Sequence, residues 1–145
     1  MTTTGSPSDG RPTYEMSPAV VAEQLDAKLG IQLVDQDPKR LVATMPVAGN
    51  RQPYGLLHGG ANAVLVESLG SLCAGMNAPN GRMPVGLELS CTHHRAATDG
   101  VVTGVATPLH IGRSTATVEV VISDDQGRRT CTGKLTCVLR ERPPG

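Results

Sequence analysis

The chain of 145 residues contains no Phe, no Trp and only two Tyr. Proteins that bind single-stranded nucleic acid commonly stack its bases on such rings, so the composition disfavours that class. Positive and negative charges also cancel, with 13 Lys and Arg against 13 Asp and Glu. Without an overall field to attract nucleic acid or an anionic membrane surface, we expect neither as a partner.

Features of secreted and membrane proteins are missing as well. The four cysteines form no Cys-x-x-Cys pair, no secretory signal precedes them, and no apolar run approaches the ~20 residues that span a bilayer. Reduced thiols in a soluble, cytoplasmic protein fit this pattern best. We expect Cys73 and Cys137 to be small core residues rather than nucleophiles.

Common cofactor and nucleophile motifs are absent too. The chain lacks G-x-G-x-x-G for dinucleotides, G-x-x-x-x-G-K-[ST] for nucleoside triphosphates and the serine-hydrolase elbow G-x-S-x-G. His93 and His94 follow Cys91, but adjacent residues of a strand point to opposite faces, and no second ligand pair follows at zinc spacing. We therefore expect no metal and no required cofactor.

The length suits one domain with a hydrophobic core that needs no disulfide or metal. Residues 1–16 are rich in Thr, Ser, Gly and Pro and contain almost nothing to bury, so we expect a flexible leader there. Residues 17–141 should form the single domain, and residues 142–145 a short tail. No internal repeat divides this domain.

Cap and turn residues divide the domain into helices and strands. Ser17 followed by Pro18 predicts a helix start, and Gly30 predicts its end. After Gly81 the apolar period changes from about 3.6 to about 2 residues, which indicates strands. The expected elements are a helix at 18–29, strands at 31–34 and 40–47, a helix from His58 to Met76, and strands at 85–95, 101–111, 114–123 and 129–140. This order packs most simply as an α+β fold, a curved antiparallel sheet wrapped around one long central helix.

Two apolar patterns predict the core. At about 100° per residue, a narrow arc of the central helix contains Ala61, Leu65, Leu69, Leu72 and Met76, and this stripe should face the sheet. In the next strand, Val85, Leu87, Leu89 and Cys91 alternate with Gly or polar residues, as the buried face of a strand does. The other side of the helix has small residues and one charge: Gly60, Ala63, Glu67, Gly70, Ser71 and Ala74. We expect this side to be covered as well, by a ligand or another backbone.

Glu67 is the leading candidate for catalysis. It is the only charged residue between Gln52 and Gly81, a stretch without Lys, Arg or Asp. A buried carboxylate without a partner is costly, and proteins keep such groups mainly where chemistry uses them. The alternative is a structural Glu that caps a helix or salt-bridges a neighbour.

The central helix begins with His58, Gly59 and Gly60. Two glycines at a helix start let a ligand approach backbone amides that have no partner within the helix, and a carbonyl oxygen or an anion would bind there. A plain flexible helix start is the alternative. Glu67 lies two and a half turns further on, too far to meet these amides on one substrate atom unless a second copy supplies one of the groups. The spacing therefore points to a homodimer or a dimer of dimers, a homotetramer.

The combined motif resembles a known family. Gln52 stands six residues before His58, Glu67 nine residues after it, and Ser71 one turn later. Together with the glycine pair and the element order, this pattern is similar to the hotdog-fold acyl-CoA thioesterases of the 4-hydroxybenzoyl-CoA and phenylacetate-pathway (PaaI-like) type. The resemblance covers residues 31–140 and implies an acyl-CoA thioesterase that releases a free acid and coenzyme A.

The resemblance also implies roles for individual residues. Glu67 would act as general base or as nucleophile, and the sequence does not separate the two. The Gly59 amide would polarise the thioester carbonyl. Gln52 and His58 would position the reacting groups, and Ser71 would orient Glu67.

Residues 110–115 are similar to the segment that contacts coenzyme A in this family. They include His110, Arg113, Ser114 and Thr115, and Arg113 would be the natural partner of a phosphate. A solvated charge at a strand end is the alternative for Arg113. Coenzyme A is then part of the substrate, and no further cofactor is implied.

Other activities remain open because one fold supports many functions. A 3-hydroxyacyl dehydratase would pair an acid with a His, which Glu67 and His58 permit. A non-catalytic acyl-CoA sensor would lack an ionisable group beside the thioester, and Glu67 argues against it. A purely structural domain would leave the one isolated charge unexplained.

Overall fold

The computed structural model describes residues 18–144. The expected leader at 1–16 and the expected N-cap Ser17 lie outside this range, so the domain boundaries remain predictions. Within the range, no helix combines the length and the apolar content needed to cross a membrane.

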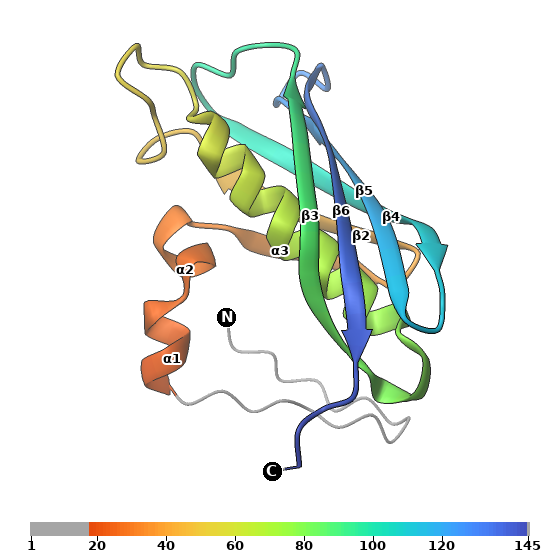
Figure 1. The fold of residues 1–145 in the computed structure, drawn as a ribbon. Helices are drawn as coiled ribbons and strands as arrows, with labels where there is room; N and C mark the ends of the chain where they lie inside the picture. The colour runs from red at the N-terminus through yellow and green to blue at the C-terminus, as the bar shows by residue number, and fades with distance from the viewer. Residues whose placement is uncertain (1–17, 145) are drawn as a thin grey trace.

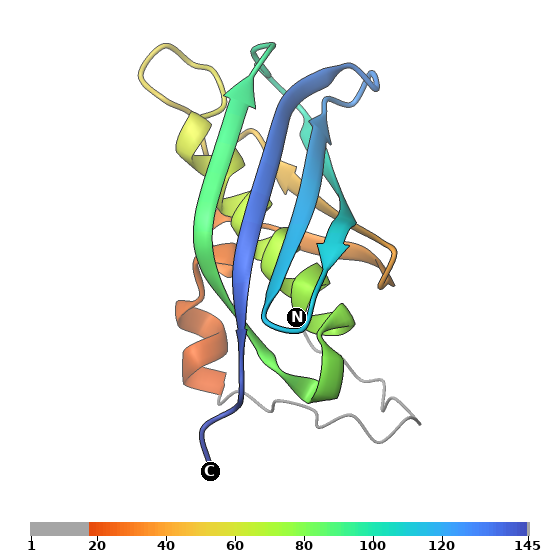
Figure 2. The ribbon, with the colours of Figure 1, turned by 45° about the vertical axis from the view of Figure 1, so that its right-hand side comes forward.

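Six antiparallel strands form one sheet in the order β1-β2-β4-β5-β6-β3. The sheet curves around the long helix α3, Gly59–Asn77, which lies on its concave side (Figures 1 and 2). The strands are β1 Gln32–Asp37, β2 Arg40–Pro46, β3 Met83–His93, β4 Val101–Ile111, β5 Thr115–Ser123 and β6 Arg129–Arg140. The α+β prediction of a curved sheet around one central helix is confirmed, and β3 is a free edge of the sheet.

The side of α3 that packs on the sheet is wider than the predicted stripe. Ala61, Leu65 and Leu69 are buried as expected, but Leu72 is 41% exposed. Gly70 and Ala74, which we expected on the opposite side, are buried instead. A Cβ atom on Gly70 would lie 2.8 Å from Cβ of Leu135, so only glycine lets the helix approach β6 this closely. The stripe prediction was too narrow because strands β2 to β6 all contact the helix, and a curved sheet covers more than one arc.

The predicted helix at 18–29 is broken in two. Helix α1 spans Pro18–Glu23 and helix α2 spans Leu25–Leu29, and Gln24 between them has an extended backbone with ψ of 137°. Gly30 ends α2 in the left-handed conformation, at φ of 71°, as the sequence predicted. The break turns α2 toward α3, where Ser68 Oγ donates a hydrogen bond to Asp26 at 2.5 Å. A contact between residues so distant in sequence is not visible in local periodicity.

A β-bulge divides the apolar row of β3 between the two faces of the sheet. The pairing with β6 shifts between Gly86 and Glu88, so the alternation of side chains changes phase there. Leu89 is paired with the buried Leu135 and faces α3, whereas Leu87 is 66% exposed. The prediction that Val85, Leu87, Leu89 and Cys91 share one buried face was therefore wrong.

Candidate active site

Glu67 lies in the middle of α3, half-buried beside β3. A Cβ atom on Gly86 would lie 2.5 Å from Oε1 of Glu67, so the carboxylate occupies the space that a side chain would fill. No residue between 18 and 144 forms an ion pair or a hydrogen bond with this carboxylate. The contacts of the described residues thus give no support to a structural role for Glu67 as cap or salt-bridge partner.

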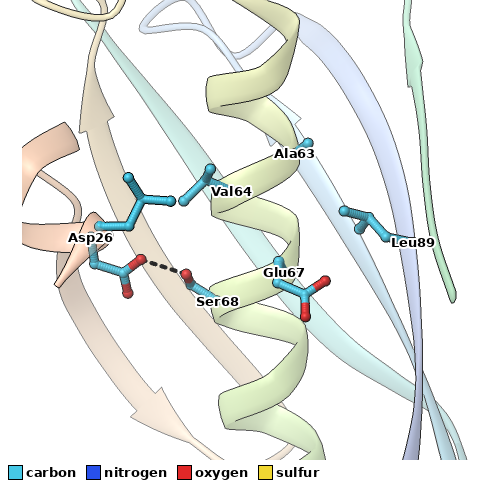
Figure 3. Close-up of a pocket in the computed structure, with 7 residues that line it drawn as sticks. Asp26, Ala63, Val64, Glu67, Ser68 and Leu89 are labelled. Atoms are coloured by element: carbon cyan, nitrogen blue, oxygen red, sulfur yellow. Dashed lines mark hydrogen bonds between the residues drawn. The ribbon is translucent and has the colours of Figure 1, made fainter. Parts of the chain in front are cut away.

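Glu67 lines a pocket of about 240 Å³ that lies between α2, α3 and the edge strand β3. Figure 3 shows Asp26 and Ser68 on one side of the helix, with Glu67 and Leu89 on the other. This side was expected to be covered, but within one chain Ala63, Glu67 and Ser71 are only half-buried and Gly60 is exposed. The pocket is lined by Leu25, Asp26, Ala63, Val64, Glu67, Ser68 and Leu89.

The loop before α3 gathers three of the predicted residues at the start of the helix. His58 is the N-cap, and its Nδ1 accepts a hydrogen bond from the Gly60 amide at 2.8 Å. The backbone of His58 donates to the Asn50 carbonyl at 2.8 Å, which folds the loop back and brings Gln52 to the same end. Among the described residues, no group accepts a hydrogen bond from the Gly59 amide, so this donor is available to a ligand.

One chain does not bring these groups to Glu67. Gly59 and Glu67 are eight residues apart on one straight helix, which corresponds to about 12 Å at 1.5 Å per residue. Ser71 lies one further turn away and makes no hydrogen bond with Glu67 in the described part of the chain. A single substrate carbonyl cannot meet Gly59 and Glu67 of the same copy.

Two residues that the sequence did not connect with the active site, His93 and Asn62, lie beside Gly59. A Cβ atom on Gly59 would lie 3.0 Å from Nε2 of His93, and Nδ1 of His93 lies 3.3 Å from Nδ2 of Asn62. Asn62 is only 5% exposed, and its Oδ1 has no hydrogen-bond partner in the part of the chain that the structure describes. A buried amide with an unused oxygen beside a free backbone donor marks this helix end as a polar site within an apolar core.

His93 and His94 face opposite sides of the sheet, as predicted. His93 packs beneath the start of α3, whereas Nε2 of His94 lies 2.9 Å from Oγ1 of Thr132. Within residues 18–144, no three His, Cys, Asp or Glu side chains lie close enough together to hold a metal ion.

The predicted coenzyme A segment forms the turn between β4 and β5. The Gly112 amide donates to the Thr115 carbonyl at 2.8 Å, and Arg82 donates to the Arg113 carbonyl at 2.8 Å. His110, Arg113 and Ser114 are exposed there. Figure 2 shows this turn near the C-terminal end of α3, away from the loop that leads into its start. The structure thus brings the four predicted coenzyme A residues of this turn together, but it places them far from His58 of the same chain.

The cysteines are free thiols, and three of them are buried. Burial raises the pKa of Cys73 to about 11, and the Asn77 hydrogen bond offsets this only in part. Burial, and then the charge of Glu67, raise the pKa of Cys137. Both are confirmed as small core residues, because their side chains are fully buried in the hydrophobic core. A thiol with a raised pKa is also a poor nucleophile at neutral pH.

Known thioesterases resemble the chain in sequence. The profile of the thioesterase superfamily matches residues 54–131. The proofreading thioesterase EntH of Cronobacter turicensis is 46% identical over 128 residues, which cover 88% of this chain and 93% of that protein. EntH of Cronobacter sakazakii is 47% identical over 112 residues, or 77% of this chain and 82% of that one.

Solved structures agree with the sequence relatives. A mutant thioesterase from Pseudomonas aeruginosa superposes with a TM-score of 0.79 at 37% identity, over 84% of this chain and 89% of that one. A thioesterase from Haemophilus influenzae gives 0.80 at 29% identity, over 90% and 94%. These relatives favour hydrolysis over the dehydratase and sensor alternatives. The chain therefore belongs to the thioesterase superfamily and is a thioester hydrolase with the hotdog fold.

Proposed function

We propose that this protein hydrolyses acyl-CoA thioesters at a site shared by two copies of the chain. The observation that carries the proposal is the position of Glu67, a carboxylate without a partner among residues 18–144, in a pocket beside a glycine that leaves it room. A hydrolase needs a base or a nucleophile next to the thioester carbon. Glu67 is the carboxylate that the central helix α3 contributes to the pocket. The proposed reaction needs no metal and no further cofactor.

The proposed reaction uses Glu67 of one copy and the Gly59 amide of the other. Glu67 takes a proton from water as the water oxygen attacks the thioester carbon. Alternatively, Glu67 attacks that carbon directly, and water then hydrolyses the resulting mixed anhydride to release the free acid and restore the carboxylate. The Gly59 amide of the second copy donates a hydrogen bond to the carbonyl oxygen, where negative charge develops before the coenzyme A thiolate leaves. Nδ1 of His58 is engaged by the Gly60 amide, so only its Nε2 is available to position the substrate. Gln52 completes this end, and Ser71 lies one turn beyond Glu67, where it can contact the attacking water.

A thioesterase from Staphylococcus aureus supports the pairing of Gln52 with Glu67. It is 30% identical to this chain and was crystallised as a Gln-to-Ala mutant and as a Glu-to-Ala mutant. The two mutated positions are fifteen residues apart, the same spacing that separates Gln52 from Glu67. We infer that both residues serve the same reaction here.

The free edge of β3 is the natural contact between the two copies. An unpaired strand edge with apolar side chains invites pairing with another strand. Val85 is 41% exposed and Leu87 is 66% exposed on this strand. A two-fold axis at this edge would cover these side chains and bring Gly59 of one copy toward Glu67 of the other. We propose a homodimer, with a dimer of dimers as the larger assembly.

Coenzyme A is proposed to lie along the turn between β4 and β5. Arg113 would bind a phosphate, and His110, Ser114 and Thr115 would supply further polar contacts. The exposure of the first three residues leaves them accessible to a ligand. The proposed setting is the cytoplasm, where acyl-CoA thioesters are available.

Complementation between two inactive variants tests the shared site. Glu67→Gln removes the base. Gly59→Pro removes the backbone donor at the first helical position, where proline fits the backbone, and its ring must displace the imidazole of His93 by a few tenths of an ångström. Each variant alone should fail to release coenzyme A from octanoyl-CoA. Coexpressed and purified as a random mixture, they should recover about a quarter of the parent activity, because half of the dimers contain one intact site. Recovery of no activity, with mixed dimers verified by mass spectrometry, would show that each chain holds its own complete site.

A further inference from the structure

The pocket beside Glu67 has walls from three elements. Leu25 comes from α2, Ala63 and Val64 from α3, and Leu89 from β3, and all four side chains are apolar. Leu25 is 53% exposed and Leu89 is 39% exposed, so both have apolar surface to offer a ligand. A substrate whose carbonyl carbon lies at Glu67 would place its acyl group against these walls.

The hydrogen bond from Ser68 to Asp26 fixes α2 in this position. The distance from Ser68 Oγ to Asp26 Oδ1 is 2.5 Å, and both residues line the pocket. Helix α2 has only five residues, too few to be stable without such contacts. The bond therefore holds Leu25 at the side of the pocket.

The volume of the pocket indicates which acyl groups its walls can contact along their whole length. Its volume is about 240 Å³. An enclosed apolar cavity of roughly 150 Å³ binds benzene, so the walls of this open pocket can contact a benzoyl ring or a chain of about six to eight carbons. An acetyl group would leave most of the walls in contact with water, and a palmitoyl chain would extend beyond them.

The charges of the pocket restrict the acyl group further. Among the described residues that line it, the two titratable ones, Asp26 and Glu67, are both acids, and none is basic. An acyl group that ends in a carboxylate would be repelled by both. We infer that the protein selects uncharged, apolar acyl groups of about six to eight carbons, and that Leu25 and Asp26 of α2 are the specificity-determining residues. This inference rests on the proposed function, because it places the reacting carbonyl at Glu67.

The experiment compares acetyl, hexanoyl, octanoyl, benzoyl and succinyl thioesters. Each acyl group is presented both on coenzyme A and on N-acetylcysteamine, and kcat/KM is measured for the full chain. Parent protein should prefer hexanoyl, octanoyl and benzoyl over acetyl and succinyl. Leu25→Asp should lower kcat/KM for octanoyl about tenfold or more relative to acetyl, because it replaces apolar wall with charge. Ala27→Asp is the matched control, since Ala27 is exposed on the same helix but does not line the pocket.

Asp26→Asn tests the charge separately. The amide oxygen of Asn can still accept the Ser68 hydrogen bond, so α2 should stay in place. The ratio of kcat/KM for succinyl over hexanoyl should rise about fivefold when the negative charge is removed.

The outcomes separate this inference from the proposed function. Hydrolysis of acyl-CoA with equal selectivity in Leu25→Asp, Ala27→Asp and parent would overturn the pocket assignment and leave the acyl-CoA proposal in place. Hydrolysis of the N-acetylcysteamine thioesters alone, with the expected selectivity, would overturn coenzyme A as the carrier and support the pocket. Preference for succinyl, or no hydrolysis of either series, would overturn the inference outright.

Discussion

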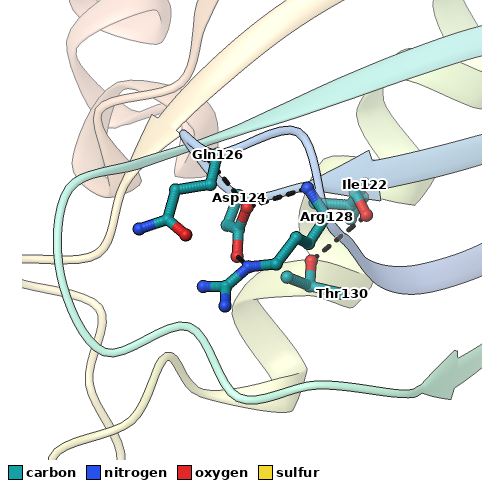
Figure 4. Close-up of polar contacts among 5 residues, drawn as sticks. All are labelled: Ile122, Asp124, Gln126, Arg128 and Thr130. Carbon is teal, nitrogen blue, oxygen red and sulfur yellow. Dashed lines mark hydrogen bonds and ion pairs between the residues drawn. The ribbon is translucent and has the colours of Figure 1, made fainter.

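Glu67 and Asp124 are two acids that the fold treats in opposite ways. Asp124, in the turn between β5 and β6, is only 7% exposed and accepts hydrogen bonds from the amides of Gln126 and Arg128 and from Nε of Arg128 (Figure 4). Glu67 is half-buried in a pocket, and no described residue pairs with it. A carboxylate with three donors stabilises its own turn and has little left to offer a substrate. A carboxylate without donors contributes no such stability and remains available for chemistry.

The difference follows from where in the sequence each acid can find hydrogen-bond partners. The partners of Asp124 are two and four residues away, so the turn satisfies the acid locally. Burial acts to raise the pKa of Asp124, but the Arg128 and Gln126 hydrogen bonds and the Arg128 charge outweigh it, so this pKa lies below its ordinary value of 3.8. Glu67 is on a helix whose neighbours in sequence are all uncharged. A partner for it could come only from another element or another molecule.

The largest effect is expected from Glu67→Gln. The amide keeps the size of the side chain but cannot act as base or nucleophile, so kcat should fall by at least ~10²-fold. The melting temperature should hold or rise, because no ion pair is lost and a carboxylate in a half-buried position is removed. Steady-state hydrolysis and thermal unfolding of the same preparation measure the two quantities. Parent-like turnover would mean that Glu67 is not the catalytic acid.

A smaller loss of rate is expected from Gly86→Ala. The added methyl group would lie 2.5 Å from Oε1 of Glu67, so the carboxylate must move away from its position. Misplacement of a catalytic group by about 1 Å can cost up to about 10²-fold, and we expect a loss of kcat between tenfold and that limit.

The matched comparison for Gly86→Ala is Glu67→Asp, alone and combined with it. The shorter acid withdraws from the new methyl group, so the two changes should be non-additive, with the double variant losing less than the product of the single losses. Strict additivity would show that Gly86 acts on the rate through something other than the position of Glu67.

The smallest effect on activity is expected from Asp124→Asn. Asn can still accept the two backbone hydrogen bonds, but its amide nitrogen would face Nε of Arg128, donor against donor. The melting temperature should fall by several degrees at pH 7 while kcat/KM stays near the parent value. A drop in activity as large as the one in Glu67→Gln would erase the contrast between the two acids.

The same variant has a defined pH dependence. Because the folded pKa of Asp124 is lowered, its ionised form contributes stability above the unfolded pKa, and this contribution is lost as the pH falls through the folded pKa below 3.8. The difference in melting temperature between parent and Asp124→Asn should therefore be full at pH 7 and shrink below about pH 4. A difference that grows on acidification would contradict the lowered pKa.

Much of the fold could be read from local sequence because burial repeats with a fixed period in each kind of element. The expected helix from His58 to Met76 differs from Gly59–Asn77 by one residue at each end. The strands at 101–111 and 129–140 match β4 and β6 at both ends. Glu67 stood out for a similar reason, since a single charge in a long uncharged stretch is visible without coordinates.

Other features depend on contacts between elements, and the sequence carried no sign of them. The bulge in β3 arises from its pairing with β6, and it moves Gly86 to the helix side and Leu87 to solvent. Without the bulge, the alternation predicted one continuous buried row. The proximity of His93 to Gly59 likewise depends on where β3 ends beneath the start of α3.

Residue type and spacing therefore identified the catalytic candidate, while packing between elements shaped the pocket around it. Asp26 and Ser68 are 42 residues apart, and neither belongs to a recognisable motif, yet their hydrogen bond places α2 at the side of the pocket. The physical reason is the sequence separation over which each kind of interaction acts. Periodicity and capping act within a few residues, whereas the walls of a pocket are set by which distant surfaces meet when the sheet closes around the helix.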